Sequence, residues 1–167
     1  VQGDPYDFPI TGSLSPAKTA LIIIDMQRDF CEEYGYVHAR GDDVSAARNI
    51  IPLIQSVRDS AIQAGIMIVY TREGHRPNLS DLPTTKRLKT ARCGAEIGSA
   101  GPLGRLLIRG EPGWDFIPEL MPRDADIIID KPGTGAFFGT DLQHVLITHG
   151  VENLVLVGVT TGVCITS

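Results

Sequence analysis

Residues 19–25, TALIIID, and residues 66–70, IMIVY, are two continuous apolar runs that decide the fold of this chain. Such runs, bounded by polar residues, are typical of strands covered on both faces in a parallel sheet. Between them, residues 44–64 carry apolar side chains at helical spacing, with Asp42 and Asp43 as candidate caps. Strand, helix and strand in this order form one crossover unit, so the sequence predicts a parallel sheet.

The rest of the chain extends the same pattern. Two further strands are predicted at residues 126–130 and 154–157, with a helix over residues 141–149 between them. Residues 71–113 lack a clear period, so we expect a lid or an oligomer contact there, with a short helix at residues 102–108. These elements together predict an α/β, three-layer Rossmann-like fold with a mostly parallel sheet flanked by helices.

The length of 167 residues predicts a single domain. Residues 1–16 are rich in Gly, Pro and Asp and are expected to wrap the surface. The chain ends three residues after Cys164, where a helix covering the sheet is expected to begin. We therefore expect residues 1–167 to form a single domain that lacks its C-terminal part.

The composition excludes several classes of partner. The net charge is −5 and no block of like charge occurs, which disfavours nucleic acid and anionic membranes. Apolar runs fall short of the roughly 20 residues that span a bilayer, so a cytoplasmic location is expected. The three cysteines form no CxxC pair and the four histidines no HxxH or HExxH pattern, so the sequence predicts neither disulfides nor a metal site.

Three chemically active residues follow three of the apolar runs: Asp25, Lys131 and Cys164. Because the carboxyl ends of parallel strands converge on one crevice, these side chains are expected to meet. A free thiol with a pKa of about 8.5 needs a base or a nearby cation to become a nucleophile, which Asp25 and Lys131 could provide. A helix beginning at Cys164 would add backbone amides for an oxyanion hole. Purely structural roles stay open as alternatives: Asp25 as a turn or cap residue, Lys131 as a solvated strand end, and Cys164 as a small buried hydrophobic residue.

Three motifs narrow these alternatives. Residues 22–30, IIIDMQRDF, residues 130–142, DKPGTGAFFGTDL, and residues 154–164, LVLVGVTTGVC, together resemble the isochorismatase-like cysteine hydrolase family. The intervening residues 71–81, TREGHRPNLSD, and residues 92–120 resemble most the branch of biuret and triuret hydrolases.

The resemblance implies a role for each matched residue. Cys164 is the nucleophile, Asp25 the general base and then the acid for the leaving amine, and Lys131 stabilises the thiolate and orients Asp25. The oxyanion hole maps onto the amides of Thr160 and Cys164, with a cis peptide before Thr160. Phe30 walls the pocket and stacks on a flat ureide, although a core role for this ring stays open.

The resemblance implies no cofactor and no metal. The pyrazinamidase and nicotinamidase branch carries an aspartate and histidines as metal ligands after its second strand, whereas this chain has TREGH at residues 71–75. Many relatives also have an acidic residue within the turn at residues 160–164, TTGVC, where this chain has Gly162, so the hydrogen bond that such a residue would provide under the nucleophile is not expected here. Four charged residues remain open as substrate contacts, subunit contacts or solvated charges: Arg72, Glu73, Arg105 and Arg109.

The predicted function is a cofactor-independent amidohydrolase that cleaves a C–N bond of a linear ureide, biuret or triuret, through a covalent acyl-enzyme. The alternatives are a family member acting on ureidoacrylate, an N-carbamoyl amide or isochorismate, and a catalytically silent scaffold domain. A Cys, His, Asp triad is disfavoured because no histidine follows Cys164. The expected partners are a small-molecule ureide or amide and further copies of the chain, with a tetramer favoured.

Overall fold

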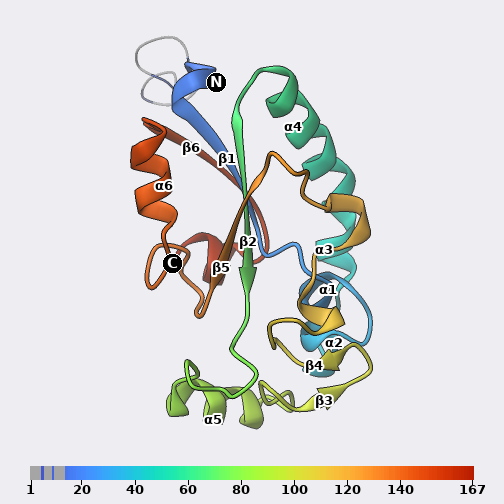
Figure 1. Cartoon of the computed structure of the whole chain (residues 1–167). Helices are drawn as coiled ribbons and strands as arrows, with labels where there is room; N and C mark the ends of the chain where they lie inside the picture. Colours follow the sequence, from blue (N-terminus) through green and yellow to red (C-terminus); the bar gives the residue numbers. More distant parts are fainter. Residues whose placement is uncertain (1–4, 6–8, 10–13) are drawn as a thin grey trace.

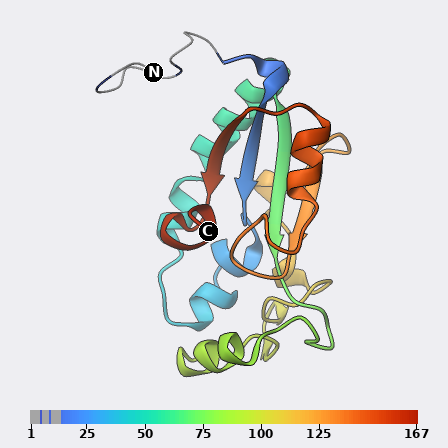
Figure 2. The ribbon, with the colours of Figure 1, turned by 90° about the vertical axis from the view of Figure 1, so that its left-hand side faces the viewer.

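A computed structural model describes residues 5, 9 and 14–167 and contains a four-stranded parallel sheet in the order β5-β2-β1-β6 (Figure 1). The strands are β1 (Thr19–Ile24), β2 (Met67–Glu73), β5 (Ile127–Lys131) and β6 (Asn153–Gly158). Helix α4 covers one face of the sheet, and α6 lies on the other, in front of the strands in Figure 2. The predicted α/β fold is therefore confirmed.

Strand β1 is the centre of this arrangement, and all six of its residues are buried. Leu21 and Ile23 pack into the core cluster on the α4 face, while Ala20, Ile22 and Ile24 pack into the cluster on the α6 face. Successive side chains of a strand point to opposite faces, so a strand with both faces covered needs apolar residues at every position. That requirement explains the uninterrupted run in the sequence.

The helix predicted over residues 44–64 is two helices, α3 (Ser45–Asn49) and α4 (Ile51–Gln63). Pro52 lies in the first turn of α4. Proline has no N–H to donate to the carbonyl four residues earlier, and its ring clashes with that carbonyl, so an unbroken helix is interrupted here. Asp43 acts at the start of α3, where its carboxylate accepts a hydrogen bond of 2.8 Å from the Ser45 amide.

The prediction of a short helix at residues 102–108 is wrong. The chain instead forms a tight antiparallel hairpin from β3 (Ala100–Gly101) and β4 (Gly104–Arg105). Gly104 has a φ of +92°, which a helix does not contain and which glycine adopts readily. The same segment contains a helix that was not predicted, α5 (Thr84–Arg92), whose only buried residue is Thr90, so it has no apolar stripe to detect.

Helix α6 (Leu142–Thr148) confirms the helix predicted over residues 141–149. The elements not yet named are shorter than α6. Among the described residues, none of the helices is long and apolar enough to cross a membrane. The prediction for residues 1–16 falls largely on residues outside those described. The short elements are α1 (Arg28–Cys31), α2 (Tyr36–Ala39), the 3-10 turns η1 (Pro16–Lys18), η2 (Pro112–Trp114) and η3 (Pro118–Leu120), and the wider π-helical turn η4 (Thr161–Ile165).

Asp29 ties α1 to the long middle segment. Its carboxylate is 1% exposed and accepts hydrogen bonds from the backbone amides of Tyr36 at 3.1 Å and Leu107 at 2.9 Å. Burial raises the pKa of Asp29 to about 6, because the two amides only partly replace the lost water. The charged form of this carboxyl is therefore disfavoured in the folded protein.

This shift predicts a pH dependence of stability. The folded state holds the Asp29 proton to a higher pH than the unfolded state, so its contribution is full below about pH 4 and is lost as the pH rises through about 6. A shift of about two units corresponds to roughly 3 kcal/mol. Asp29→Asn should lack this loss, which urea unfolding at pH 4 and pH 7 would measure. An equal loss in both proteins would contradict the assignment.

Candidate active site

The carboxyl ends of the four strands bring together the three residues singled out in the sequence. Asp25 follows β1, Lys131 ends β5, and Cys164 lies in the η4 turn after β6. Asp25 and Lys131 are 0% exposed and Cys164 is 6% exposed. One oxygen or sulfur atom from each of Asp25, Glu73 and Cys164 lies within 4.8 Å of the other two.

Asp25 and Lys131 form a fixed, buried ion pair. Asp25 Oδ2 lies 2.7 Å from Lys131 Nζ, and the Thr71 hydroxyl donates a hydrogen bond of 2.6 Å to Asp25 Oδ1. Lys131 Nζ also donates to the carbonyls of Gly133 at 3.0 Å and Thr134 at 2.9 Å. The glycine-rich turn after β5 therefore supplies acceptors for the ammonium.

Glu73 is the site residue that the sequence left undecided. Its Oε2 accepts a hydrogen bond of 3.5 Å from the Cys164 thiol and lies 3.4 Å from Lys131 Nζ, while Oε1 lies 2.5 Å from Lys86 Nζ. The sequence predicts a strand that ends at residue 70, whereas β2 runs to Glu73. Extending the strand by these residues would have placed this carboxylate at the same sheet edge as Asp25.

The three arginines that the sequence analysis left open lie outside the candidate active site. Arg72 stacks on the Trp114 ring, 3.7 Å from its centroid, and pairs with Asp130 at 2.8 Å. Arg105 and Arg109 donate to backbone carbonyls of the middle segment, at 2.8 Å to Pro77 and 2.9 Å to Gly74. None of the three lines the cavity that contains Cys164. The contacts of these arginines stabilise the long middle segment, residues 71–113.

The buried charges shift one another's pKa values. Burial raises the pKa of Asp25, and the Lys131 ammonium only partly opposes this. Burial alone would raise the pKa of Glu73 as well, but Lys131 and Lys86 outweigh it and lower the pKa. Burial alone would lower the pKa of Lys131, but Asp25 and Glu73 outweigh it and raise the pKa. Glu73 is therefore a carboxylate and Lys131 an ammonium at neutral pH.

The pKa of the Cys164 thiol and the position of Cys164 in its turn both differ from the expectation. Burial and the neighbouring Asp25 raise the pKa of Cys164, and Lys131 only partly opposes them. The helical turn begins at Thr161, so Cys164 lies inside it and not at its start. The predicted helix start at Cys164 is therefore wrong, whereas a thiolate stabilised by Lys131 during the reaction stays a prediction. The thiol is protonated at neutral pH, so it must lose its proton as it attacks.

Cys164 opens onto a cavity of about 520 Å³. Phe30, Glu73, Thr160 and Cys164 are among the lining residues, whereas Asp25 and Lys131 are not. Phe30 is 8% exposed and makes an edge contact with Tyr36, with ring centroids 6.1 Å apart. The peptide between Val159 and Thr160 is cis, as the resemblance implies.

A metal does not fit these residues. Asp25, Glu73 and Cys164 could offer three ligand atoms, but the Lys131 ammonium already lies 2.7 Å from Asp25 and 3.4 Å from Glu73. A divalent cation there would be placed against a buried ammonium, with no counter-charge left to offset the repulsion.

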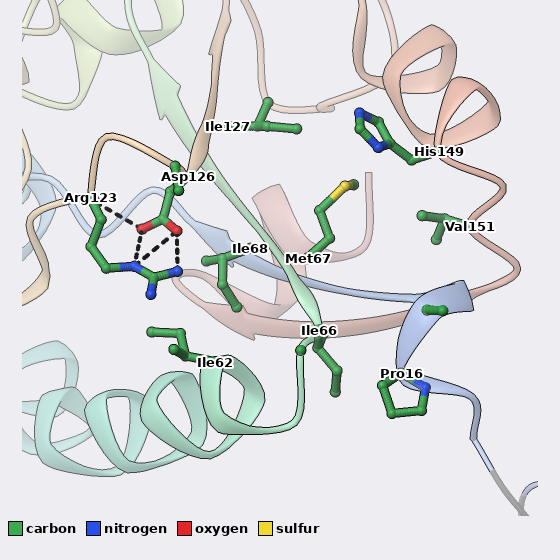
Figure 3. Close-up of a pocket in the computed structure, with 13 residues that line it drawn as sticks. Pro16, Ile62, Ile66, Met67, Ile68, Arg123, Asp126, Ile127, His149 and Val151 are labelled. Carbon is green, nitrogen blue, oxygen red and sulfur yellow. Dashed lines mark hydrogen bonds and ion pairs between the residues drawn. The ribbon is translucent and has the colours of Figure 1, made fainter.

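A second cavity, of about 390 Å³, lies at the opposite end of the sheet, around the start of β2 (Figure 3). Ile66, Met67, His149 and Val151 are among the residues that line it. The charged side chains Arg123 and Asp126 pair with each other at 2.6 Å. Its lining includes no cysteine, so the nucleophile chemistry belongs to the cavity at the carboxyl ends of the strands.

A model of the isochorismatase domain matches residues 19–167. The chain belongs to the isochorismatase family. It is 37% identical to ureidoacrylate amidohydrolase RutB of Acinetobacter baylyi, over 92% of this chain and 64% of that protein. It is 34% identical to RutB of Agrobacterium fabrum, over 95% of this chain and 70% of that protein. The family predicted from the motifs is confirmed, whereas these relatives are ureidoacrylate amidohydrolases and not biuret hydrolases.

Solved structures agree with the family assignment. A cysteine hydrolase from Pseudomonas syringae pv. phaseolicola superposes with a TM-score of 0.74 at 30% identity, over 90% of this chain and 63% of that one. The pyrazinamidase of Pyrococcus horikoshii, solved in complex with zinc, gives 0.64 at 26% identity, over 88% of this chain and 73% of that one. The chain thus spans less than two thirds of the Acinetobacter and Pseudomonas proteins.

Proposed function

We propose that the protein is a cysteine-dependent amidohydrolase that cleaves a C–N bond of a ureide, with Cys164 as its nucleophile. The observation that carries this proposal is a thiol on the wall of a cavity, hydrogen-bonded to a carboxylate and backed by a buried Asp25–Lys131 ion pair. This arrangement offers a nucleophile, a proton acceptor and a fixed positive charge around one point. The family assignment supports it.

The proposed reaction follows from these groups. Sγ attacks the carbonyl carbon as a nearby carboxylate, proposed to be Asp25, takes the thiol proton. The carbonyl electrons move to oxygen, which the amides of Thr160 and Cys164 are proposed to stabilise. The C–N bond then breaks and the amine leaves with the proton from Asp25. Water hydrolyses the remaining acyl-enzyme and regenerates the thiol.

For the substrate we propose a ureidoacrylate-type ureide ahead of biuret or triuret, because the named relatives hydrolyse ureidoacrylate. The test is ammonia release from ureidoacrylate, biuret and triuret, together with pyruvate release from isochorismate. Ureidoacrylate should give the largest kcat/KM. A panel in which no ureide releases ammonia would reject the proposal and favour a silent scaffold or the vinyl ether reaction.

Thr71 is expected to position the proposed base. Its hydroxyl is the donor to Asp25 Oδ1, and Thr71 is 0% exposed. A hydrogen bond to a charged group contributes about 1.5–3 kcal/mol, so Thr71→Val should lower kcat roughly 10- to 100-fold. Losing this donor also raises the pKa of Asp25 further, so the acidic limb of the pH profile should move to higher pH. Thr71→Ser keeps the hydroxyl and should stay within about threefold; a Val variant with an unchanged pH profile would contradict this role.

The remaining sequence predictions also enter as proposals. Phe30 is proposed to stack on the flat ureide, supported by its place on the cavity wall. The protein is proposed to be a cytoplasmic homo-oligomer, with a tetramer favoured, which light scattering of the purified protein would test.

A further inference from the structure

Lys86 reaches from α5 into the candidate active site, although α5 itself lies beyond the carboxyl ends of the strands (Figure 1). Its ammonium lies 2.5 Å from Glu73 Oε1 and 3.1 Å from His75 Nε2, and its side chain is 22% exposed. A lysine on a surface helix normally extends its charge into water. Here two buried partners hold the ammonium at the cavity wall.

His75 is part of the support for this lysine. The ring is 0% exposed, and its Nδ1 lies 3.4 Å from Asp81 Oδ1. An ammonium can only donate, so Nε2 must be the acceptor and the ring hydrogen must sit on Nδ1, facing Asp81. Burial and Lys86 lower the pKa of His75, which keeps the ring neutral. Asp81, His75 and Glu73 therefore fix where the Lys86 charge lies.

The charge on the cavity wall is positive. Arg40, Lys86 and Lys89 line the cavity together with a single carboxylate, Glu73. Glu73 is already shared among Lys131, Lys86 and the thiol. Arg40 is paired with Asp42 at 3.0 Å, so the excess positive charge on the wall comes from Lys86 and Lys89, and this charge attracts an anion. A neutral ureide such as biuret has no use for that charge.

We propose that Lys86 is a specificity-determining residue that binds the carboxylate of a ureido acid whose ureido carbonyl faces Cys164. Glu73 and His75 accept from two of the three N–H groups of the ammonium, which leaves one for a ligand in the cavity. Glu73 contacts Lys86 through Oε1 and the thiol through Oε2, so nucleophile and ammonium lie one carboxylate group apart. This spacing suits a carboxylate separated from the ureido group by a short carbon chain. The inference rests on the proposed function and names its substrate class.

The test compares an anionic and a neutral ligand. N-carbamoyl-β-alanine and its primary amide differ only in the carboxylate, and their binding is measured by calorimetry on Cys164→Ala, with and without Lys86→Met. The charged contact predicts a roughly 10- to 100-fold loss of affinity for the acid and less than about a threefold change for the amide. Lys86→Arg should recover part of the loss for the acid. Arg92→Met removes one positive charge from the same helix outside the cavity and should change neither affinity.

Turnover measurements distinguish a failure of the proposed hydrolase function from a failure of the proposed role of Lys86. If Cys164 hydrolyses no ureide, the proposed function fails, while the binding comparison still tests Lys86. If ureides are hydrolysed, Lys86→Met should raise KM for the ureido acid with kcat changed less than about tenfold. Equal losses for the acid and the amide, or equal binding of the acid to both proteins, would overturn the role of Lys86. Unchanged unfolding midpoints would exclude misfolding as the cause.

Discussion

Cys164→Ala is expected to lower kcat/KM for the best ureide at least about 10³-fold, because no other group can replace the nucleophile. The thiol is 6% exposed on the cavity wall and donates to Glu73. Cys164 belongs to the core cluster on the α6 face, but the substitution removes a single sulfur atom from that cluster, so the urea unfolding midpoint should change little. The loss should therefore be one of chemistry and not of folding.

Three measurements check this expectation. Ammonia release gives the rate, and mass spectrometry of the quenched reaction should find an acyl adduct on the wild-type chain but none on Cys164→Ala. Cys93→Ala is the matched control, since it removes the other thiol that lines this cavity, an exposed one outside the carboxylate cluster, and should lower kcat/KM far less than Cys164→Ala does. A Cys164→Ala protein that keeps a tenth of the activity would rule out the proposed nucleophile.

The protonated resting thiol has a further consequence for the same residue. Because burial and Asp25 raise the pKa of Cys164, its alkylation by iodoacetamide at neutral pH should be slow and should accelerate as the pH rises. Rapid, pH-independent alkylation would instead indicate a stable thiolate. Slow labelling alone is thus no sign of a silent scaffold, which only the turnover measurement identifies.

Lys131→Met is expected to destabilise the protein by about 3–5 kcal/mol, because it leaves buried carboxylates without their counter-charge. Asp25 is 0% exposed and Glu73 is 4% exposed, so neither can regain water in the folded state. The carbonyls of Gly133 and Thr134 lose their donor as well. Activity should fall together with stability, since Asp25 loses the group that orients it.

Urea unfolding of Lys131→Met at several pH values tests this account. Without the ammonium, the folded-state pKa of Asp25 lies further above its unfolded value and that of Glu73 rises from its lowered value, so the loss of stability relative to the wild type should shrink as the pH falls and both groups take up protons. Adding Asp25→Asn to Lys131→Met should recover part of the loss at neutral pH. Lys18→Met removes a lysine from an exposed ion pair with Glu152 and should cost less than about 1 kcal/mol. Equal effects of the two lysine substitutions would refute the buried ion pair.

Hydrophobic patterning along the chain predicts the sheet and the meeting of three residues at the candidate active site. A strand with both faces covered must be apolar at every position, so residues 19–24 identify β1 without any knowledge of their neighbours. Parallel strands bring their carboxyl ends to one edge, so Asp25, Lys131 and Cys164 could be expected together from their positions alone. The family followed from the same motifs.

The tertiary structure alone decided the rest. Helix α5 has a single buried residue and hence no apolar period, so only long-range contacts bring Lys86 to Glu73 and His75. The protonation of Cys164 likewise depends on burial and on the distances to Asp25 and Lys131. Hydrophobic periodicity is a local property that a sequence displays, whereas the free energy of a buried charge depends on every group around it in space.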